Sequence, residues 1–405
     1  MPTAAHNADR PPLKIGAIFM ASGGVGELGA DSFDGAEAAR TLVNDAGGVD
    51  GRPVAWVRAD GATPAAAAEA AERMIRDDGV RAIVGCYGSN HTIEVSKVCE
   101  RLGAVLWAQT AWTTTLFDHR PRFTFRSNNH AGIVEAAAVD FVLDRVAPRL
   151  GKAADALRVA VINEASAYGL SCGEETVKAL AHRGVAPVLT RTYAAEYDGA
   201  ALDFDALVAE VRAAAPDALF ASSFIRDSIG LLKAMRRAGW RPPVIMTSSA
   251  GFGLYTLNLA GRETEGVLSA NAPARINSAA LSPHGRALQV EYVTRLKGLT
   301  GREPSGFNAM AFVAAYSLLA DVLPRARAPD DPEAIREAAL ACDVPAGDYP
   351  NGWGLKFDAT GQNTRCPASI DQWRGGGLHT IWPPEWATTT LADTPLAPVC
   401  SGSFT

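Results

Sequence analysis

The chain has 405 residues, and at roughly 100 to 200 residues per domain this length predicts two domains or one large α/β unit. Charged residues make up 20% and hydrophobic residues 48% of the chain, which excludes wholesale disorder because apolar burial can offset the entropy of ordering. The net charge of −6 disfavours nucleic acid and anionic membranes as partners. No apolar run approaches the ~18 residues of a membrane span.

Short apolar strands alternate with amphipathic helices along the first part of the chain. A strand at 13–20 leads through a glycine-rich segment, 22–29, into a helix at 34–45. Further strands are expected at 54–58, 82–84 and 105–108, and further helices at 64–76 and 92–102. This alternation predicts a parallel, doubly wound sheet.

A second series of similar length begins near Arg126. Helices are expected at 132–149, 171–183, 204–214 and 227–238, and strands at 158–163, 188–193, 218–222 and 244–247. Two similar lobes in succession predict a cleft where the carboxyl ends of both sets of strands meet.

Three helices follow, at 284–297, 308–323 and 331–340, and then short strands at 355–357, 368–373 and 378–382. We therefore expect an α/β protein of two Rossmann-like, doubly wound lobes joined by three crossings, near 126–128, 269–272 and 352–354. Lobe 1 would hold residues 13–127 plus 272–352, and lobe 2 would hold 128–271 plus 353–395. Residues 1–12 and 396–405 are expected to be flexible termini.

Two motifs resemble those of enzymes. Residues 24–29 match G-x-G-x-x-G, with Asp60 after the next strand, but a pyrophosphate site needs its strand to end at the turn. We therefore expect a glycine-rich loop lining the cleft. Residues 169–173 match G-x-S-x-G, but the preceding strand does not run into the first glycine. We expect Ser171 to cap a helix, with Glu174 completing a capping box.

The spacing of the histidines and cysteines does not indicate a metal or redox site. The seven histidines form no H-E-x-x-H motif, and the six cysteines include no C-x-x-C pair. We therefore predict no metal site. Taken with the two weak motifs above, we expect no cofactor and no enzyme, and a dehydrogenase or hydrolase stays open as an alternative. The cysteines are expected to be small buried or surface thiols, and one disulfide stays open for an oxidising compartment.

Polar clusters follow two neighbouring strands of the first lobe, at 85–90 and 109–115. Hydroxyls and backbone N–H groups at a helix N-terminus can hold an anion without lysine or arginine. Ordinary helix capping is the alternative. Two such clusters facing one cleft favour a carboxylate-binding site.

The chain resembles the periplasmic substrate-binding proteins of ABC transporters, of the branched-chain amino-acid type with periplasmic binding protein fold type I. Less closely, it resembles the cytosolic amide-sensing repressor of the same fold, notably at 84–87. The resemblance covers roughly residues 13 to 385, and the segment 44–53 carries it most specifically. It also rests on 14–16, 34–36, 84–85 with Ser89, 168–169, 217–220, 236–240, 265–266 and 354–358 with Gly361.

The resemblance implies a ligand site and a role for each of its residues. A serine hydroxyl and the next strand's loop would hold the ligand carboxylate, aromatic side chains would close over it from lobe two, and other residues would form the side-chain pocket. These positions match, in that order, Ser89 with Thr110, Ala111, Trp112 and Thr113; Tyr168 and Phe224; and Tyr87, Gly88 and Phe307.

One departure concerns the acid that pairs with the ligand's ammonium in that family. It should lie near Ala250, where residues 247–251 contain no Asp or Glu, and a buried ammonium without an acceptor is costly. Unless Glu164 or Asp227 substitutes, we expect an aromatic or short aliphatic acid, or an amide. The hypothesis is a monomeric importer component that docks a membrane permease in the periplasm, although the sequence as given shows no signal peptide. A cytoplasmic amide- or acid-sensing regulator is the alternative.

Overall fold

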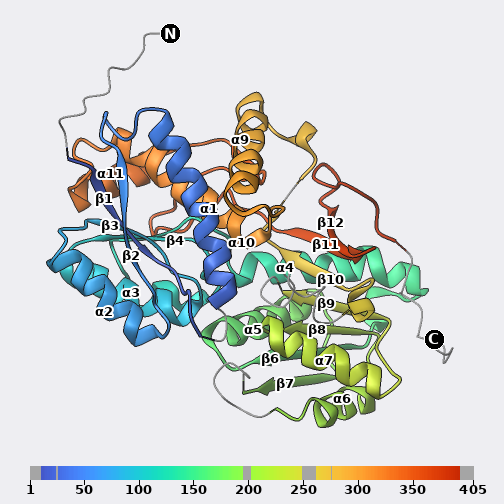
Figure 1. The fold of residues 1–405 in the computed structure, drawn as a ribbon. Coiled ribbons are helices and arrows are strands. Elements are labelled where there is room, and N and C mark those ends of the chain that lie inside the picture. The colour runs from blue at the N-terminus through green and yellow to red at the C-terminus, as the bar shows by residue number, and fades with distance from the viewer. Residues whose placement is uncertain (1–10, 24–25, 195–201, 249–260, 275, 393–405) are drawn as a thin grey trace. The chain divides into compact units, whose positions relative to one another are not determined.

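The computed structural model describes residues 11–23, 26–194, 202–248, 261–274 and 276–392 (Figure 1). The chain divides into two compact units of discontinuous sequence. Unit 1 contains residues 1–129 and 272–367, and unit 2 contains residues 130–271 and 368–405. Both units are α/β, as predicted from the alternating strands and helices.

Unit 1 is built on a parallel five-stranded sheet with the order β2-β1-β3-β4-β5. Helices cover both faces of this sheet, with α2 and α3 on one face and α1, α10 and α11 on the other (Figure 1). The strands are β1 (Leu13–Ile18), β2 (Val54–Ala59), β3 (Ala82–Gly85), β4 (Val105–Ala108) and β5 (Thr124–Arg126). The helices are α1 (Gly26–Asp45), α2 (Pro64–Arg76), α3 (Ser89–Leu102), α9 (Pro283–Thr300), α10 (Gly306–Tyr316) and α11 (Pro332–Ala341).

Helices α1 and α10 pack against each other unusually closely. A Cβ atom added at Gly35 would lie 2.0 Å from the carbonyl oxygen of Asn308, so only glycine fits this crossing. Asp31 of α1 accepts a 3.0 Å hydrogen bond from the Asn308 amide. Ser305 and Asn308 form a capping box at the start of α10, which fixes where the helix begins.

Unit 2 is built on a seven-stranded sheet with the order β12-β11-β10-β9-β8-β6-β7. Its pairs are parallel except β10–β11 and β11–β12, which are antiparallel. The strands are β6 (Val159–Glu164), β7 (Leu189–Tyr193), β8 (Ala218–Ser222), β9 (Val244–Ser248), β10 (Leu268–Asn271), β11 (Ser369–Arg374) and β12 (Gly377–Trp382). The helices are α4 (Ala131–Phe141), α5 (Ala167–His182), α6 (Phe204–Ala213) and α7 (Ile225–Arg237).

The segment 353–367 belongs to unit 1 and not, as predicted, to the second lobe. Phe357 makes edge contacts with Trp107 and Phe125 at centroid distances of 5.1 and 5.0 Å. Residue 362 forms an isolated bridge with Arg126. The expected strand at 355–357 is a pair of isolated bridges, so the side chains of this segment complete the unit 1 core.

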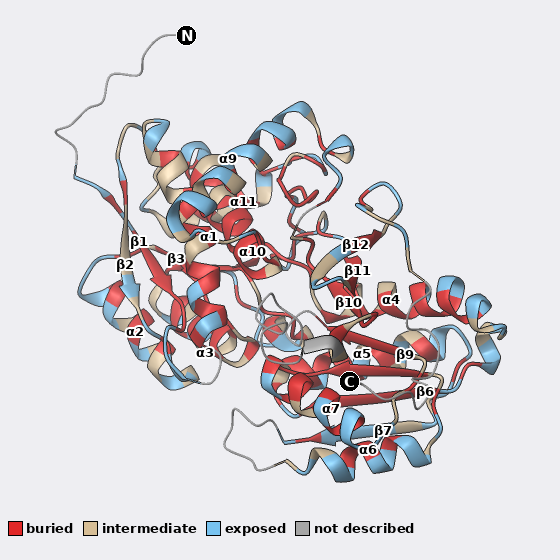
Figure 2. Cartoon of the chain, turned by 45° about the vertical axis from the view of Figure 1, so that its right-hand side comes forward, coloured by how far each residue is buried: buried red, intermediate tan, exposed pale blue. Residues whose placement is uncertain are grey.

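In the described part of the chain, one helical stretch, Gly306–Arg325, is long and apolar enough to cross a membrane, but 78% of its apolar window is buried (Figure 2). Its burial indicates that it is a core helix of unit 1. It is also broken: α10 ends at Tyr316, and a π-helical turn, Ser317–Val322, precedes Pro324. Proline removes a backbone donor and disrupts a continuing helix, which explains why the helix predicted at 308–323 is shorter.

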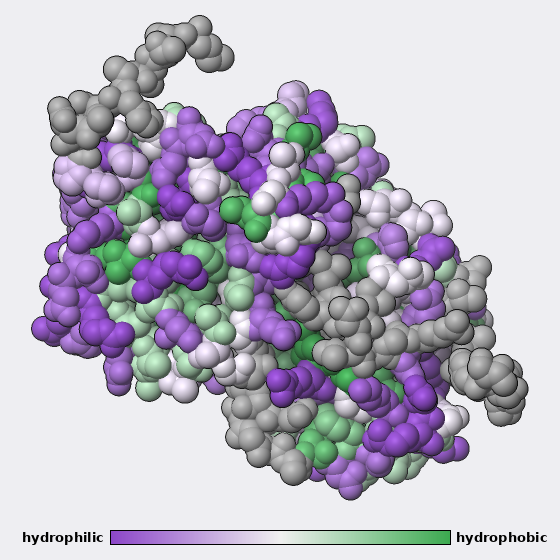
Figure 3. Space-filling model, viewed as in Figure 1, coloured by the Kyte–Doolittle hydropathy of each residue, from purple (hydrophilic) through white to green (hydrophobic). Residues whose placement is uncertain are grey.

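Hydrophilic residues cover most of the face shown in Figure 3, with hydrophobic ones scattered between them. Exposed large hydrophobic side chains in the described part are Leu170, Val188, Val290 and Leu299. The described cysteines 86, 99, 172, 342 and 366 are free and buried. For these five positions, the interpretation as buried thiols is confirmed.

Candidate functional site

The two polar clusters predicted at 85–90 and 109–115 follow the carboxyl ends of β3 and β4. Ser89 is the first residue of α3, and its N-cap, Gly88, provides no side-chain cap. Gly88 has φ 89°, a left-handed conformation that favours glycine. The first turn of α3 therefore presents the Ser89 hydroxyl together with the positive end of the helix dipole.

Hydrogen bonds join the two loops. The backbone N–H of Thr113 donates to Ser89 Oγ at 3.2 Å, and the Thr110 hydroxyl donates to the carbonyl of Cys86 at 2.9 Å. A serine hydroxyl can accept two hydrogen bonds and donate one. Ser89 can accept from Thr113 and still direct its own proton to a carboxylate. The structure thus brings Ser89, Thr110 and Thr113 together within unit 1.

Arg126 lies behind this loop and was missed as a site component by sequence reasoning. Its guanidinium donates to the carbonyls of Ala111 and Thr113 and to the side-chain oxygen of Gln362. Burial lowers the pKa of Arg126 to about 10, so the group is charged at neutral pH. Arg126 is a positioning residue for the loop, because its hydrogen bonds fix the orientation of the Ala111 and Thr113 carbonyls.

Aromatic side chains flank the loops of unit 1. The rings of Tyr87 and Phe307 meet edge to face at 5.5 Å, and both are nearly fully buried. Trp112 is 3% exposed. These side chains form an apolar surround beside the polar loops, which is the arrangement found in small-molecule sites.

Unit 2 brings together its own pair of predicted aromatic residues. Tyr168 lies in the first turn of α5 and Phe224 is the N-cap of α7. Their ring centroids are 5.4 Å apart. Burial is the main cause that raises the pKa of Tyr168 well above its usual value, so its hydroxyl is protonated and can serve as a donor.

The N-cap of α5 is Ser166, and the prediction that Ser171 caps this helix is wrong. The Ser166 hydroxyl accepts from the backbone N–H groups of Tyr168 and Gly169, while Ser171 lies inside the helix and is buried. The helix begins four residues earlier than predicted, at Ala167. Because Ser171 is held in the interior of a regular helix, it lacks the strained turn that a nucleophile elbow requires.

Glu164 ends β6 and is used within unit 2. Its carboxylate accepts from the backbone N–H of Ser166 at 2.5 Å, from the Ser166 hydroxyl and from the N–H of Gly169 at 2.9 Å. Burial is the largest cause that raises its pKa to about 7, and the charge of Asp227 adds to the rise. With three internal donors, Glu164 is a poor acceptor for a ligand ammonium.

Asp227 lies in the first turn of α7 and is 1% exposed. It is the second acid that could replace the family's ammonium partner. Ala250, the position where that partner was expected, lies outside the described residues.

Asp60 holds the start of the segment between β1 and α1. The expectation of a loop over 22–29 is wrong for residues 26–29, because α1 begins at Gly26 and not at residue 34. The carboxylate of Asp60 accepts from the backbone N–H of Ala21 at 2.9 Å and from the Ser22 hydroxyl at 2.5 Å. In a dinucleotide site the corresponding acid binds a ribose, whereas here it is hydrogen-bonded to its own loop. Gly24 lies outside the described residues. The described residues contain no cluster of three or more potential metal ligands.

A family model described as periplasmic binding protein matches residues 12–377. The chain therefore belongs to the periplasmic binding protein family. Its fold is that of periplasmic binding protein type I, as its similarity to solved structures shows.

The chain is 28% identical over 381 residues to Leu/Ile/Val-binding protein homolog 7 of Brucella abortus, covering 94% of this chain and 93% of the relative. It is 29% identical over 395 residues to homolog 8 of Brucella suis, with coverages of 96% and 95%.

Solved structures show the same fold at lower identity. A leucine-binding protein from Thermotoga maritima superposes with a TM-score of 0.77 at 21% identity, covering 91% of this chain and 97% of that one. A branched-chain amino acid transporter substrate-binding protein from Streptococcus pneumoniae, solved with isoleucine, has a TM-score of 0.76 at 18% identity, with coverages of 92% and 100%.

Proposed function

We propose that the protein is the solute-binding component of an ABC importer and captures a small carboxylate between its two units by hinge closure. It performs no chemistry and delivers the solute to a membrane permease. The family match and the names of its relatives, which are Leu/Ile/Val-binding protein homologs, support this function. Residence in the periplasm and a monomeric state belong to the same proposal.

The observation that carries the proposal is the polar cradle of unit 1. Ser89 at the start of α3 and the Thr113 N–H bonded to it place a hydroxyl and a helix N-terminus beside the 110–113 loop. Such a cradle favours a carboxylate because a charge-assisted hydrogen bond is about twice as strong as a neutral one. Tyr168 and Phe224 would close over the ligand from unit 2.

Two acids of unit 2, Glu164 and Asp227, are candidates to take a ligand ammonium. Glu164 accepts three internal hydrogen bonds, and we take Asp227, a buried acid in the first turn of α7, as the candidate to test. If Asp227 accepts the ammonium, the ligand is an α-amino acid such as the isoleucine bound by the Streptococcus pneumoniae neighbour. If it does not, the ligand is an aromatic or aliphatic acid, or an amide.

A thermal-shift panel tests the function and the ligand class together. Leucine and valine are compared with their 2-keto acids, with benzoate and with small amides. Stabilisation by the amino acids alone, lost in Asp227→Asn, assigns the ammonium to Asp227. Stabilisation by the keto acids or benzoate assigns an ammonium-free ligand. A panel without any stabilising compound counts against solute capture by this family's site.

The carboxylate role of Ser89 is tested on the compound that the panel identifies. Removing one hydrogen bond to a charged group costs about 1.5–3 kcal/mol. Ser89→Ala should therefore weaken binding by about 10- to 100-fold in calorimetric titration. The matched control is Ser278→Ala, an exposed serine of unit 1. Equal affinity of both variants for the compound would contradict a hydrogen bond between the Ser89 hydroxyl and the ligand carboxylate.

The free thiols favour a second candidate function. The five described cysteines are unpaired, as is usual in a reducing compartment, and a cytosolic amide- or acid-sensing regulator of the same fold would reside there. Osmotic-shock fractionation of the native host separates the two functions. Release of the protein with the periplasmic contents supports the importer component, and retention in the cytosol supports the sensor.

A further inference from the structure

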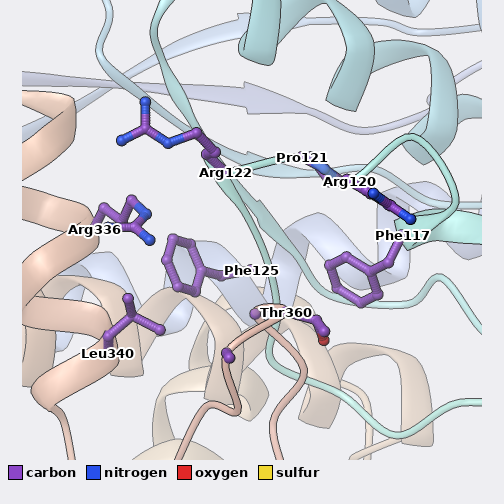
Figure 4. Close-up of a pocket in the computed structure, with 10 residues that line it drawn as sticks. Phe117, Arg120, Pro121, Arg122, Phe125, Arg336, Leu340 and Thr360 are labelled. Atoms are coloured by element: carbon purple, nitrogen blue, oxygen red, sulfur yellow. The ribbon is translucent and has the colours of Figure 1, made fainter.

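A pocket of about 220 Å³ opens on unit 1 outside the predicted ligand site (Figure 4). It lies between α11, the chain segment that leads into β5, and the turn at 359–361. None of the predicted ligand-binding residues lines it. The residues that do line it come from three stretches of sequence that the fold of unit 1 brings together.

The charged residues that line the pocket are Arg120, Arg122 and Arg336, and no acidic residue is among the lining residues. Arg122 pairs with Glu333 at 2.8 Å. Arg120 and Arg336 form no ion pair with any described residue. The chain as a whole carries a net charge of −6, so this gathering of cations departs from its average surface.

Arg126 adds a fourth positive charge next to the pocket. Its guanidinium carbon lies 5.1 Å from the ring centroid of Phe117, one of the lining residues. Its hydrogen-bond acceptors are backbone carbonyls and the Gln362 amide oxygen, which are all uncharged. Among the described residues, Asp358 interacts electrostatically with Arg126 without hydrogen-bonding to it, so Arg126 adds a partly compensated positive charge beside the pocket.

The apolar wall of the pocket is formed by Phe117, Phe125 and Leu340. Phe125 is 1% exposed and packs against Trp107 and Phe357, with ring centroids 5.6 and 5.0 Å away. Aromatic side chains held in this way are already in place before a ligand arrives. Preorganisation reduces the entropic cost of binding.

We propose that this pocket binds a small organic anion with a flat apolar body, such as an aromatic carboxylate. Figure 4 shows Arg122 and Arg336 on one side of the Phe125 ring and Arg120 beside Phe117 on the other. The body of the ligand packs on the aromatic wall, and its anionic group is held by a guanidinium. A pocket of about 220 Å³ lies below the usual range for drug-sized ligands and suits a single-ring molecule. This site is separate from the proposed solute cleft and does not depend on it.

The test is a titration of the purified full chain with 4-(trifluoromethyl)benzoate, followed by fluorine NMR line broadening. We expect Arg120→Ala and Arg336→Ala each to raise the dissociation constant of one binding event by about two- to fivefold, as loss of a partly exposed charged contact predicts. Arg73→Ala is the matched control, because Arg73 is an exposed arginine of unit 1 on α2. Uncharged 4-(trifluoromethyl)benzyl alcohol should bind more weakly than the acid.

Ser89→Ala distinguishes this site from the proposed solute cleft, which is also proposed to take carboxylates. The arginine-dependent event should persist in Ser89→Ala, whatever happens to binding in the cleft. The proposal is overturned if neither arginine variant changes the titration, if Arg73→Ala changes it equally, or if Ser89→Ala removes the event. Circular dichroism and melting temperature of each variant verify that it is folded.

Discussion

The buried carboxyl group of Glu135 should make the protein less stable as the pH rises. Glu135 is 2% exposed and accepts from the hydroxyls of Ser248 at 2.9 Å and Thr176 at 3.0 Å. Neither partner is charged, and burial is the main cause that raises its pKa from 4.5 to about 7. The folded state therefore holds this proton more tightly than the unfolded state does. The contribution of this carboxyl group to stability is fully present below about pH 4.5 and is lost as the pH rises through 7.

Glu135→Gln removes this titration while keeping the shape of the side chain. The pKa difference is 7 − 4.5 = 2.5 units, and at about 1.36 kcal/mol per unit the ionised group costs about 3 kcal/mol. A glutamine can accept from one hydroxyl and donate to the other. The variant should exceed the wild type in unfolding free energy by about 3 kcal/mol at pH 8, and this advantage should shrink to about 1 kcal/mol at pH 5.

Urea unfolding at pH 5, 6, 7 and 8 measures the difference directly. Glu174→Gln, an exposed position on α5 of the same unit, is the matched control for replacing a glutamate by a glutamine. Glu164 and Asp371, whose pKa values burial raises to about 7 and about 6, give the wild type further pH dependence of the same sign. A difference between Glu135→Gln and wild type that is the same at pH 5 and pH 8 would refute the reasoning.

Three further predictions concern the fold. Gly35→Ala places a Cβ 2.0 Å from the Asn308 carbonyl oxygen and should lower the free energy of unfolding by at least about 2 kcal/mol. Gly298→Ala, with open space around it, should raise it by about 0.5–1 kcal/mol. Equal effects of both variants in urea unfolding would contradict the close crossing of α1 and α10. Arg120→Gly relieves a φ of 52° and should raise the melting temperature while weakening anion binding in the pocket; a lower melting temperature would contradict it. Chain fragments 1–203 and 204–405 should each lack a cooperative unfolding transition because unit 1 draws on both; a cooperative transition in either fragment alone would disprove this.

Local patterns were enough to place some regular elements within their exact bounds, although α1 begins eight residues before its predicted start. The predicted strands at 105–108 and 218–222 and the helix at 64–76 coincide with β4, β8 and α2. In α2, Thr63 caps the N-terminus and Pro64 occupies the first turn, and both signals are local in sequence. The alternation of such elements was sufficient to predict the α/β class.

The errors arose where a local signal competed with a second local signal or with tertiary packing. Ser166 and Ser171 both precede helical residues, and Ser166 became the cap because Glu164 accepts from its backbone N–H and hydroxyl. The short strand β5 (Thr124–Arg126) was missed because its three residues make too short a pattern. It is held by pairing with β4.

The candidate site was predictable where it follows strand ends, and less so where it depends on contacts across the chain. Ser89 and Thr110 could be proposed because polar residues directly follow two apolar strands. Arg126 could not, because its role depends on carbonyls of Ala111 and Thr113 that are oriented by the folded loop. The sequence does contain one indication, because an arginine that follows apolar residues in a strand can be buried only if it has hydrogen-bond acceptors.

The arginine pocket could be predicted from the sequence even less than the role of Arg126. Arg336 lies more than 200 positions from Arg120 and Arg122 in the sequence, and each arginine alone resembles an ordinary surface residue. They share one pocket because α11 and β5 belong to the same unit, although unit 2 intervenes between them in the chain. In a protein whose units are each assembled from two distant segments, new surface sites arise where those segments meet. Charge patterns along the sequence cannot reveal them, because the residues that share such a site are separated by the larger segment of another unit, here 130–271.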